Sequence, residues 1–326
     1  MSSRSTAAGR RPRGRALALG ALLVTAALAA VPSAASAWTS VSMLGTIHVF
    51  DRTGADNAFV VTQSGPVVSI RDAGGDPLTG MVPSSCTVVG GDTLECSWGS
   101  ASPPPVLGFA LEGGDDSVDA TGYDSAITVL ASPGADMIIG GDAADRIDGG
   151  DGDDVIDGGG GGDSLEGGAG DDVVFGGDGN DALFGGADDD RLDGGLGGDS
   201  IIGREGHDIV DYSSRTRALV VTLNSGVYDG EIGENDRVNI DVEEVLGGSG
   251  DDEFHANGTV RTTLRGGAGN DRLYGGYGAD LLDGGAGDDL LDGGGEADDL
   301  QCGADLDSYR TDGLDTVAGD CELLIP

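Results

Sequence analysis

An aspartate recurs at every ninth residue between Gly140 and Asp211, and this spacing is the strongest chemical signal in the sequence. Eight consecutive nine-residue units keep phase without an insertion. Their sixth position is always aspartate: Asp145, Asp154, Asp163, Asp172, Asp181, Asp190, Asp199 and Asp208. Their eighth position is always Ile, Leu or Val. One fixed acid and one fixed apolar residue at a constant period predict a repeat architecture.

The first six positions of each unit suit a site for a hard cation. They are rich in glycine, which takes the positive φ angles of a sharp turn without steric cost. Such a turn points main-chain carbonyl oxygens inward, and the aspartate adds a carboxylate. Oxygen ligands without thiolate or imidazole favour Ca²⁺, which takes six to eight of them.

The last three positions must place these turns in register. We expect them to form a short strand whose middle residue points inward, because side chains alternate across a strand. Two units then make one coil of eighteen residues, and coils stack about 4.8 Å apart. The sequence therefore predicts an all-β parallel solenoid with a thin apolar core and calcium ions between successive turns.

The pattern returns after an interruption. It resumes as GGSGDDEFH at Gly247, passes through a degenerate ten-residue unit at 256–265, and continues in four units over 266–301. This second array adds five more position-six aspartates as metal-ligand candidates: Asp252, Asp271, Asp280, Asp289 and Asp298.

The unit GGxGxDxUx, in which U is apolar, resembles the RTX, or haemolysin-type, calcium-binding nonapeptide repeat. Nine units keep the full glycine and aspartate pattern, starting at Gly149, Gly158, Gly167, Gly176, Gly194, Gly247, Gly266, Gly275 and Gly284. The resemblance implies a parallel β-roll that forms when calcium binds. It also implies carboxylate ligands from the position-six aspartates and main-chain oxygens from neighbouring glycines, for which the candidates are Gly149, Gly158, Gly167, Gly176, Gly266, Gly275 and Gly284. The split arrangement is similar to that of small exported proteins of this kind from high-GC Gram-positive (actinobacterial-like) bacteria.

Four units depart from this pattern. Ala143, Asp188, Arg204 and Glu296 replace a glycine. We expect weaker calcium sites there, above all beside Arg204, because a cation next to a calcium site is unfavourable.

Two other interpretations of the repeat are disfavoured. A flexible Gly/Asp linker would not keep an acid at position six and an apolar residue at position eight through so many units. The segment 178–181 superficially resembles an EF-hand loop, but no flanking helix is predicted and the nine-residue phase accounts for it.

The N-terminal segment is predicted to be a signal peptide, residues 1–37. Arginines precede an apolar run at 16–30, and Ala35-Ser36-Ala37 makes a small-residue cleavage site. The run is short for a transmembrane span. We therefore expect a secreted, extracellular protein with no membrane span after cleavage; an Arg10-Arg11 pair leaves the Sec and Tat routes open.

Composition limits the partners. The net charge is −41, and 63 of 326 residues are glycine. The negative electrostatic field of this chain favours the binding of divalent cations and disfavours the binding of nucleic acid and anionic membranes. Any extracellular or cell-surface partner stays unidentified.

Four cysteines, Cys86, Cys96, Cys302 and Cys321, predict two disulfides in an exported chain. Local pairing, 86 with 96 and 302 with 321, is the most economical of three connectivities. The absence of a CxxC motif and the scatter of three histidines disfavour a zinc site.

The remaining segments complete the predicted order. After the signal peptide we expect an N-terminal β region (38–111), a first array (112–211), a β insert (212–246), a second array (247–301) and a C-terminal cap closed by a disulfide (302–326). Strands are expected at 46–50, 58–62, 67–70, 87–89, 106–111, 218–223 and 238–242. The stack is expected to begin near Gly114.

Three functions remain for test. The first is a secreted calcium-binding protein that folds on binding Ca²⁺. The second is an adhesion or matrix module that uses the roll as a spacer. A cryptic hydrolase is the third and the least favoured, since the sequence has no HExxH or GxSxG motif and we expect no enzyme.

Overall fold

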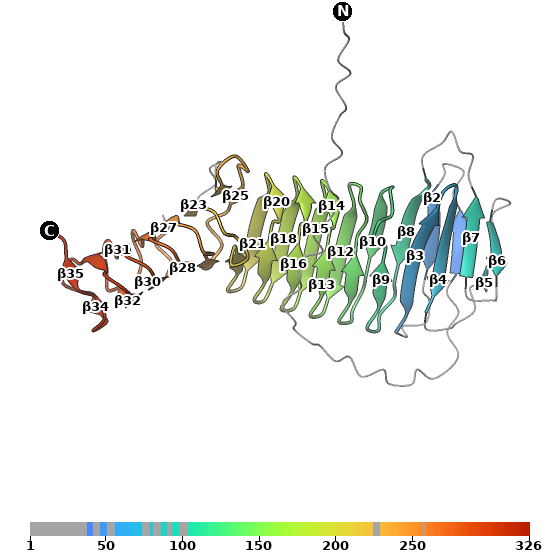
Figure 1. The fold of residues 1–326 in the computed structure, drawn as a ribbon. Helices are drawn as coiled ribbons and strands as arrows, with labels where there is room; N and C mark the ends of the chain where they lie inside the picture. Colours follow the sequence, from blue (N-terminus) through green and yellow to red (C-terminus); the bar gives the residue numbers. More distant parts are fainter. Residues whose placement is uncertain are drawn as a thin grey trace, which may run out of the picture. The chain divides into compact units, whose positions relative to one another are not determined.

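The computed structural model describes residues 38–41, 46–50, 56–73, 79–80, 86–89, 93–97, 104–223, 229–256 and 258–326. The expected signal peptide, residues 1–37, lies outside these ranges. Throughout the described ranges the secondary structure is β, without a helix (Figure 1). Accordingly, none of these residues belongs to a helix long and apolar enough to cross a membrane. The all-β parallel solenoid expected from the repeat is confirmed.

The chain alternates between two large sheets as it winds. The first sheet has ten strands in the described residues and the order β25-β21-β18-β15-β12-β10-β8-β2-β1-β5. Its strands are β1 (Trp38–Val41), β2 (Thr46–Phe50), β5 (Thr79–Gly80), β8 (Val106–Ala110), β10 (Ile127–Leu130), β12 (Arg146–Asp151), β15 (Ser164–Ala169), β18 (Ala182–Ala187), β21 (Ser200–Glu205) and β25 (Arg237–Val238).

The second sheet has fifteen strands in the described part of the chain and runs through both arrays, in the order β34-β32-β30-β28-β26-β22-β19-β16-β13-β11-β9-β3-β4-β7-β6. Its strands are β3 (Ala58–Ser64), β4 (Val67–Asp72), β6 (Cys86–Val89), β7 (Thr93–Ser97), β9 (Ser117–Asp119), β11 (Met137–Ile139), β13 (Val155–Asp157), β16 (Val173–Phe175), β19 (Arg191–Asp193), β22 (Ile209–Asp211), β26 (Glu244–Leu246), β28 (Thr263–Ala268), β30 (Leu281–Ala286), β32 (Asp299–Ala304) and β34 (Thr316–Val317).

Two smaller sheets complete the winding. A seven-stranded sheet supplies the other strands of the second array and contains β23 (Leu219–Leu223), β24 (Gly230–Glu231), β27 (Glu253–Ala256), β29 (Arg272–Tyr274), β31 (Leu290–Asp292), β33 (Ser308–Arg310) and β35 (Leu323–Leu324). A three-stranded sheet follows the turns of the first array through β14 (Gly160–Gly161), β17 (Asp178–Gly179) and β20 (Leu196–Gly197).

Strand register confirms the coil of eighteen residues. Ile147 pairs with Leu165 in the first sheet, and Ile156 pairs with Val174 in the second, both in parallel. The strands of the first sheet are longer than expected, however. In β12 and β15 pairing continues through the glycine-rich turn, where Gly150 opposes Gly168. These strands therefore have six residues, since stacked turns of equal length keep hydrogen-bonding where a lone turn would not.

The core consists of two columns of apolar residues, one from each of the two opposing walls of the solenoid. The position-eight residues are buried, with exposed fractions of 0 or 1 % from Ile147 through Val210 and 0 % for Leu273, Leu282, Leu291 and Leu300. Burying such a side chain contributes about 1.5–3 kcal/mol. This core is the reason the eighth position is apolar, aliphatic in most units and aromatic at the buried Phe254.

The stack begins earlier than Gly114. Strand β8 pairs in parallel with β2, and β9 pairs in parallel with β3, so coils extend back into the N-terminal region. Beyond them β4, β7 and β6 pair antiparallel. Cys86 and Cys96 face each other across β6 and β7 and form the expected disulfide.

The insert changes one wall of the stack and leaves the other continuous. Strand β22 pairs with β26 and β26 with β28, so the second sheet crosses the insert. The first sheet ends at β25, and the seven-stranded sheet starts at β23. The strand expected at 238–242 is wrong beyond Val238, because the chain turns at 240–241, where the Asn239 side chain accepts the N–H of Ile240.

Candidate calcium-binding site

Each position-six aspartate lies at the start of a strand and is buried. The exposed fractions of the thirteen predicted aspartates run from 0 to 4 %. One carboxylate oxygen, Oδ1, accepts the main-chain N–H of the aspartate one coil earlier; Asp145 N lies 2.7 Å from Asp163 Oδ1, and Asp154 N lies 2.8 Å from Asp172 Oδ1. The same bond recurs through both arrays, for the pairs 163–181, 172–190, 181–199, 190–208, 252–271, 271–289 and 280–298. The structure therefore brings the predicted aspartates together in rows along the turns.

The other carboxylate oxygen, Oδ2, lacks a hydrogen-bond partner in eleven of the thirteen. These buried oxygens belong to Asp154, Asp163, Asp172, Asp181, Asp190, Asp199, Asp208, Asp271, Asp280, Asp289 and Asp298. A buried acceptor without a partner costs about 1–3 kcal/mol, and a charged one costs more. A row of such oxygens is therefore unstable unless a cation or protons compensate it.

Asp145 and Asp252 are the two exceptions. Each is the first aspartate of its row, and its Oδ2 accepts the N–H of a glycine, Gly141 at 2.7 Å and Gly248 at 3.2 Å. Their carboxylates are thus already satisfied by the protein.

The position-one glycine has no side chain to fill the space beside each Oδ2, and we call this space the cradle. A methyl group on Gly158 would lie 2.5 Å from Asp163 Oδ2 and 2.6 Å from the carbonyl oxygen of Gly176. On Gly275 it would lie 2.8 Å from Asp280 Oδ2 and 2.6 Å from the carbonyl oxygen of Gly293. The same two oxygens flank Gly149, Gly167, Gly176, Gly266 and, with the Cys302 carbonyl, Gly284. All seven predicted glycines thus lie where a carboxylate and a main-chain carbonyl of the next coil converge.

These donors fit calcium. Among the described residues no group of three or more His, Cys, Asp or Glu side chains could hold a metal ion. The oxygens that converge at these turns are a single carboxylate and a main-chain carbonyl. An all-oxygen donor set of this kind suits Ca²⁺, which accepts flexible geometry and water as further ligands.

Comparison with known families supports this fit. The family described as the RTX calcium-binding nonapeptide repeat matches in four copies, over residues 130–165, 157–192, 184–214 and 263–300. The chain carries RTX calcium-binding repeats. No curated protein matches the chain. The four copies cover most of both arrays, and they leave out the N-terminal β region and the C-terminal turns.

Burial perturbs the acidity of the RTX carboxylates. Desolvation raises the pKa of Asp154, Asp163, Asp172 and Asp289 to about 7, against an ordinary value of 3.8, and neighbouring aspartates add to the increase. Main-chain N–H groups oppose the increase by donating to the ionised carboxylates. The ionised row is therefore strained near neutral pH in the absence of a counter-ion.

The departing RTX units keep the turn at a conformational cost. Asp188, Arg204 and Glu296 take φ angles of 78°, 84° and 79°, in the left-handed region that favours glycine. The Arg204 guanidinium lies 2.6 Å from Glu166 Oε1 and 4.8 Å from the centre of the Phe184 ring, on the outer face of the sheet. It is thus paired away from Asp208, whose Oδ2 stays buried and without a partner.

The rows include acids that sequence reasoning did not assign. Asp116 and Asp136 extend one row backwards, with Asp136 N 2.7 Å from Asp154 Oδ1. Asp307 extends another forwards, and its position nine residues after Asp298 could have identified it. Acids outside the repeat phase take the last place in other rows, where they accept the N–H of Asp199, Asp208 and Asp298: Asp236, Glu243 and Asp315. No spacing predicts these.

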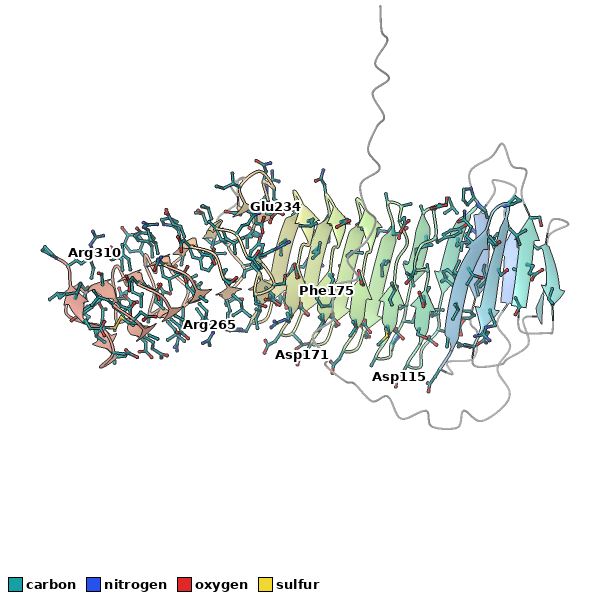
Figure 2. All side chains as sticks on the ribbon, viewed as in Figure 1. Asp115, Asp171, Phe175, Glu234, Arg265 and Arg310 are labelled. Carbon is teal, nitrogen blue, oxygen red and sulfur yellow. A yellow bond between two sulfur atoms is a disulfide. The ribbon has the colours of Figure 1, made fainter. Side chains whose placement is uncertain are left out.

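A second, exposed row accompanies the buried one on a single edge. The position-five residues Asp153, Asp171 and Asp189 are linked through their main-chain N–H groups. Asp115 and Asp171 lie along this edge in Figure 2. The opposite turns carry Ala144, Gly162, Asn180 and Gly198 at position five, so the two edges of the first array differ in charge.

Proposed function

We propose that this chain is a secreted calcium-binding protein whose RTX repeats fold into the parallel β-roll as Ca²⁺ binds. The ligands would be Oδ2 of the position-six aspartates together with main-chain oxygens of the position-one glycines. The observation that carries the proposal is the row of buried Oδ2 atoms without partners, seven of which lie beside a glycine that also faces a carbonyl oxygen of the next coil.

Calcium supplies positive charge and a partner for oxygens that the protein leaves without one. The chain's own residues do the rest. The aspartate Oδ1 atoms bind the preceding coil, the glycines leave space beside Oδ2, and the position-eight residues exclude water from the core. Asp145 and Asp252 would contribute least, because Gly141 and Gly248 already donate to their Oδ2 atoms.

Folding is expected to depend on calcium because the stack has little else to offset its charge. The chain has 58 acidic and 17 basic residues, and its core is one apolar side chain thick on each side. A ligand that binds only the folded state stabilises it, so its binding free energy becomes folding free energy.

Export is proposed from independent features. The N-terminal 37 residues have the composition of a cleavable signal peptide. Two disulfides, Cys86–Cys96 and Cys302–Cys321, suit an oxidising compartment. The calcium-rich extracellular space would then keep the repeats loaded.

Direct binding measurements test the proposal. Chelator-treated protein comprising residues 38–326 is titrated with Ca²⁺ and with Mg²⁺ by isothermal calorimetry. We expect several calcium ions per chain to bind, and Mg²⁺ to bind far more weakly because it requires a stricter octahedral geometry. Absence of calcium binding at millimolar concentration would refute the proposal.

A further inference from the structure

The insert interrupts strand pairing on one wall of the stack. In a solenoid each coil contacts only its neighbours, so the contacts between adjacent coils decide whether distant coils unfold together. At the insert the second sheet continues through β22, β26 and β28. On the opposite wall the first sheet ends at β25 and the seven-stranded sheet begins at β23, so strand pairing does not join the two arrays there.

One basic side chain is buried at this junction. Arg215 is 8 % exposed, and it is the only buried basic residue in the part of the chain that the structure describes. It ends a tight turn that begins at Tyr212, whose carbonyl oxygen accepts the N–H of Arg215 at 2.9 Å. A buried charge is costly unless it is paired, so the contacts of the guanidinium must offset its burial.

The guanidinium replaces a donor that the first array loses where it ends. Within the array, the carbonyl oxygen of a position-two glycine accepts an N–H of the next coil, as Gly177 accepts that of Leu196 at 2.6 Å. The repeat stops before a further coil could donate to Gly195 in the same way. Arg215 Nη2 donates to the carbonyl oxygen of Gly195 instead, and it also lies 3.8 Å from Asp193 Oδ1.

Arg215 also supplies positive charge to the acids of the junction. Desolvation raises the pKa of Asp193 and Asp236, and the charge of Arg215 opposes this increase. Both carboxylate oxygens of Asp236 have partners, because Oδ1 accepts the N–H of Asp199 and Oδ2 accepts the hydroxyl of Tyr212. The junction therefore carries a counter-charge of its own.

The main chain of the same residue faces the second array. The carbonyl oxygen of Arg215 accepts the N–H of Ser249, in the first unit of that array, at 3.0 Å. A methyl group on Gly248 would collide with this oxygen, so the two turns are in close contact. The carbonyl oxygen of Gly248 in turn accepts the N–H of Ala268, one coil further on, at 3.0 Å. Arg215 thus contacts the first array through its side chain and the second array through its main chain.

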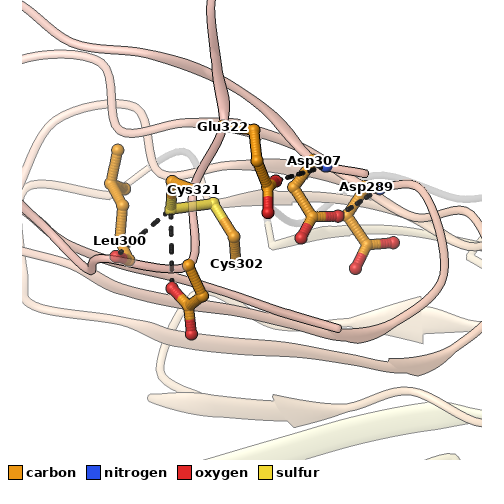
Figure 3. Close-up of a disulfide and its surroundings, with 7 residues drawn as sticks. Asp289, Leu300, Cys302, Asp307, Cys321 and Glu322 are labelled. Atoms are coloured by element: carbon orange, nitrogen blue, oxygen red, sulfur yellow. Dashed lines mark hydrogen bonds between the residues drawn. A yellow bond between two sulfur atoms is a disulfide. The ribbon is translucent and has the colours of Figure 1, made fainter. Parts of the chain in front are cut away.

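The far end of the second array is held in a different way. The Cys302–Cys321 disulfide closes the turn that follows the array, where the N–H of Asp307 donates to Glu322 Oε2 at 3.0 Å (Figure 3). No cysteine lies between Cys96 and Cys302 in the sequence. Non-covalent contacts alone must therefore join the two arrays.

We propose that Arg215 couples the two arrays, so that they unfold as one cooperative unit although the repeat is interrupted. Its guanidinium gives the first array the donor and the positive charge of the missing coil, and its carbonyl oxygen extends this contact to the second array. The coupling does not depend on which ion the repeats bind, so it is tested separately from the proposed function.

Hydrogen exchange, measured by mass spectrometry along a urea series, tests the coupling in the oxidised chain comprising residues 38–326 in excess calcium. Peptides from β13 and β16 report the urea midpoint of the first array, and peptides from β30 and β31 report that of the second. The parent should show one midpoint for both arrays. Arg215→Gln should separate the two midpoints by about 1 M, as expected when a buried ion pair loses one partner.

The matched control is Arg217→Gln, which makes the same charge change two residues later at a side chain that is 81 % exposed. Its two midpoints should coincide as in the parent. Coincident midpoints in folded Arg215→Gln, or separate midpoints in the parent, overturn the proposal. A parent that binds no calcium refutes the proposed function, and the midpoints of the two arrays still decide the coupling.

Arg215→Lys distinguishes the charge from the shape of the side chain. It keeps the charge and a donor, and Nη2 makes the hydrogen bond to Gly195 while Nε is buried without a partner. We therefore expect a smaller separation of the midpoints than in Arg215→Gln. If Arg215→Gln does not fold in excess calcium, as judged by circular dichroism, Arg215→Lys is scored, and coincident midpoints in that variant overturn the proposal.

Discussion

Each repeat divides the work of its aspartate between two oxygens. In Asp172, Oδ1 accepts the N–H of Asp154 at 2.8 Å, while Oδ2 is buried beside Gly167 without a partner. One atom thus organises the stack, and the other is the ligand in the proposed calcium site. The sequence predicts which residues converge, through the nine-residue phase, but it does not distinguish the two oxygens. It also did not predict that Gly141 and Gly248 satisfy Asp145 and Asp252, because both bonds depend on the chain path at the start of a row.

Replacing Asp172 with asparagine should weaken the calcium-saturated protein. The amide keeps an oxygen for the N–H of Asp154 but removes the charge and places an N–H₂ group beside the carbonyl oxygen of the next coil. We expect a loss of about 1–3 kcal/mol in the free energy of unfolding, measured by urea denaturation in excess calcium. Asp171→Asn, on the exposed row, should change the free energy of unfolding by less than about 0.5 kcal/mol. Equal effects at the two positions would contradict the assignment of Asp172 as a ligand.

A methyl group on Gly158 should block the cradle. It would stand between Asp163 Oδ2 and the Gly176 carbonyl oxygen, at 2.5 and 2.6 Å. Gly158→Ala should therefore raise the calcium concentration at the folding midpoint in a titration followed by circular dichroism. The matched control is Gly160→Ala, where the nearest heavy atom lies 3.8 Å away and where four other repeats carry alanine. A shift of the same size in the control would mean that glycine flexibility, and not the cradle, is responsible.

At the scale of strands and coils, the nine-residue period predicted more of the structure than the strand propensities of single residues did. Two units per coil and an inward position-eight residue follow from the nine-residue spacing, and the pairing of Ile147 with Leu165 bears this out. The six-residue length of β12 does not follow, because stacking converts a turn into a paired strand only once neighbouring coils exist. The insert was least predictable, since side chains such as Asn239 decide its path.

One row of carboxylates ends in the insert, at an aspartate that accepts a hydrogen bond from a tyrosine hydroxyl. Asp236 accepts the N–H of Asp199 at 3.0 Å, and its second oxygen accepts the hydroxyl of Tyr212 at 3.0 Å. Tyr212 is completely buried. Tyr212→Phe leaves that oxygen without a donor, so we expect a loss of about 1–3 kcal/mol in the free energy of unfolding in excess calcium. Tyr277→Phe, 71 % exposed, should have almost no effect; a similar loss there would contradict this role.

Acid should partly replace calcium. The pKa of Asp154, Asp163 and Asp172 is about 7 in the folded chain against 3.8 ordinarily, so between these values the folded state holds more protons than the unfolded state. Stability without calcium must then fall as pH rises from about 4 to about 7. We expect chelated protein to retain β structure at pH 5 and to lose it by pH 8, as measured by circular dichroism. β structure that is independent of pH in chelator would contradict this prediction.

At the scale of the whole molecule, charge and packing oppose each other. A net charge of −41 repels itself along the rows, while the second sheet runs unbroken through both arrays and their insert. The composition and the repeat phase predicted both the acidity and the solenoid. The continuity of the second sheet across the insert could not be predicted. It depends on the pairing of β26 with β22, in which Ile209 lies opposite Glu244, a residue thirty-five positions later in the sequence.

The most direct test is a calcium titration at pH 7.5 of the chain without residues 1–37, followed by far-ultraviolet circular dichroism. We predict little β structure in chelator and a cooperative gain of β structure as calcium reaches millimolar concentration, because ions must neutralise the buried Oδ2 rows before the coils can stack. Identical β spectra in chelator and in excess calcium would contradict it.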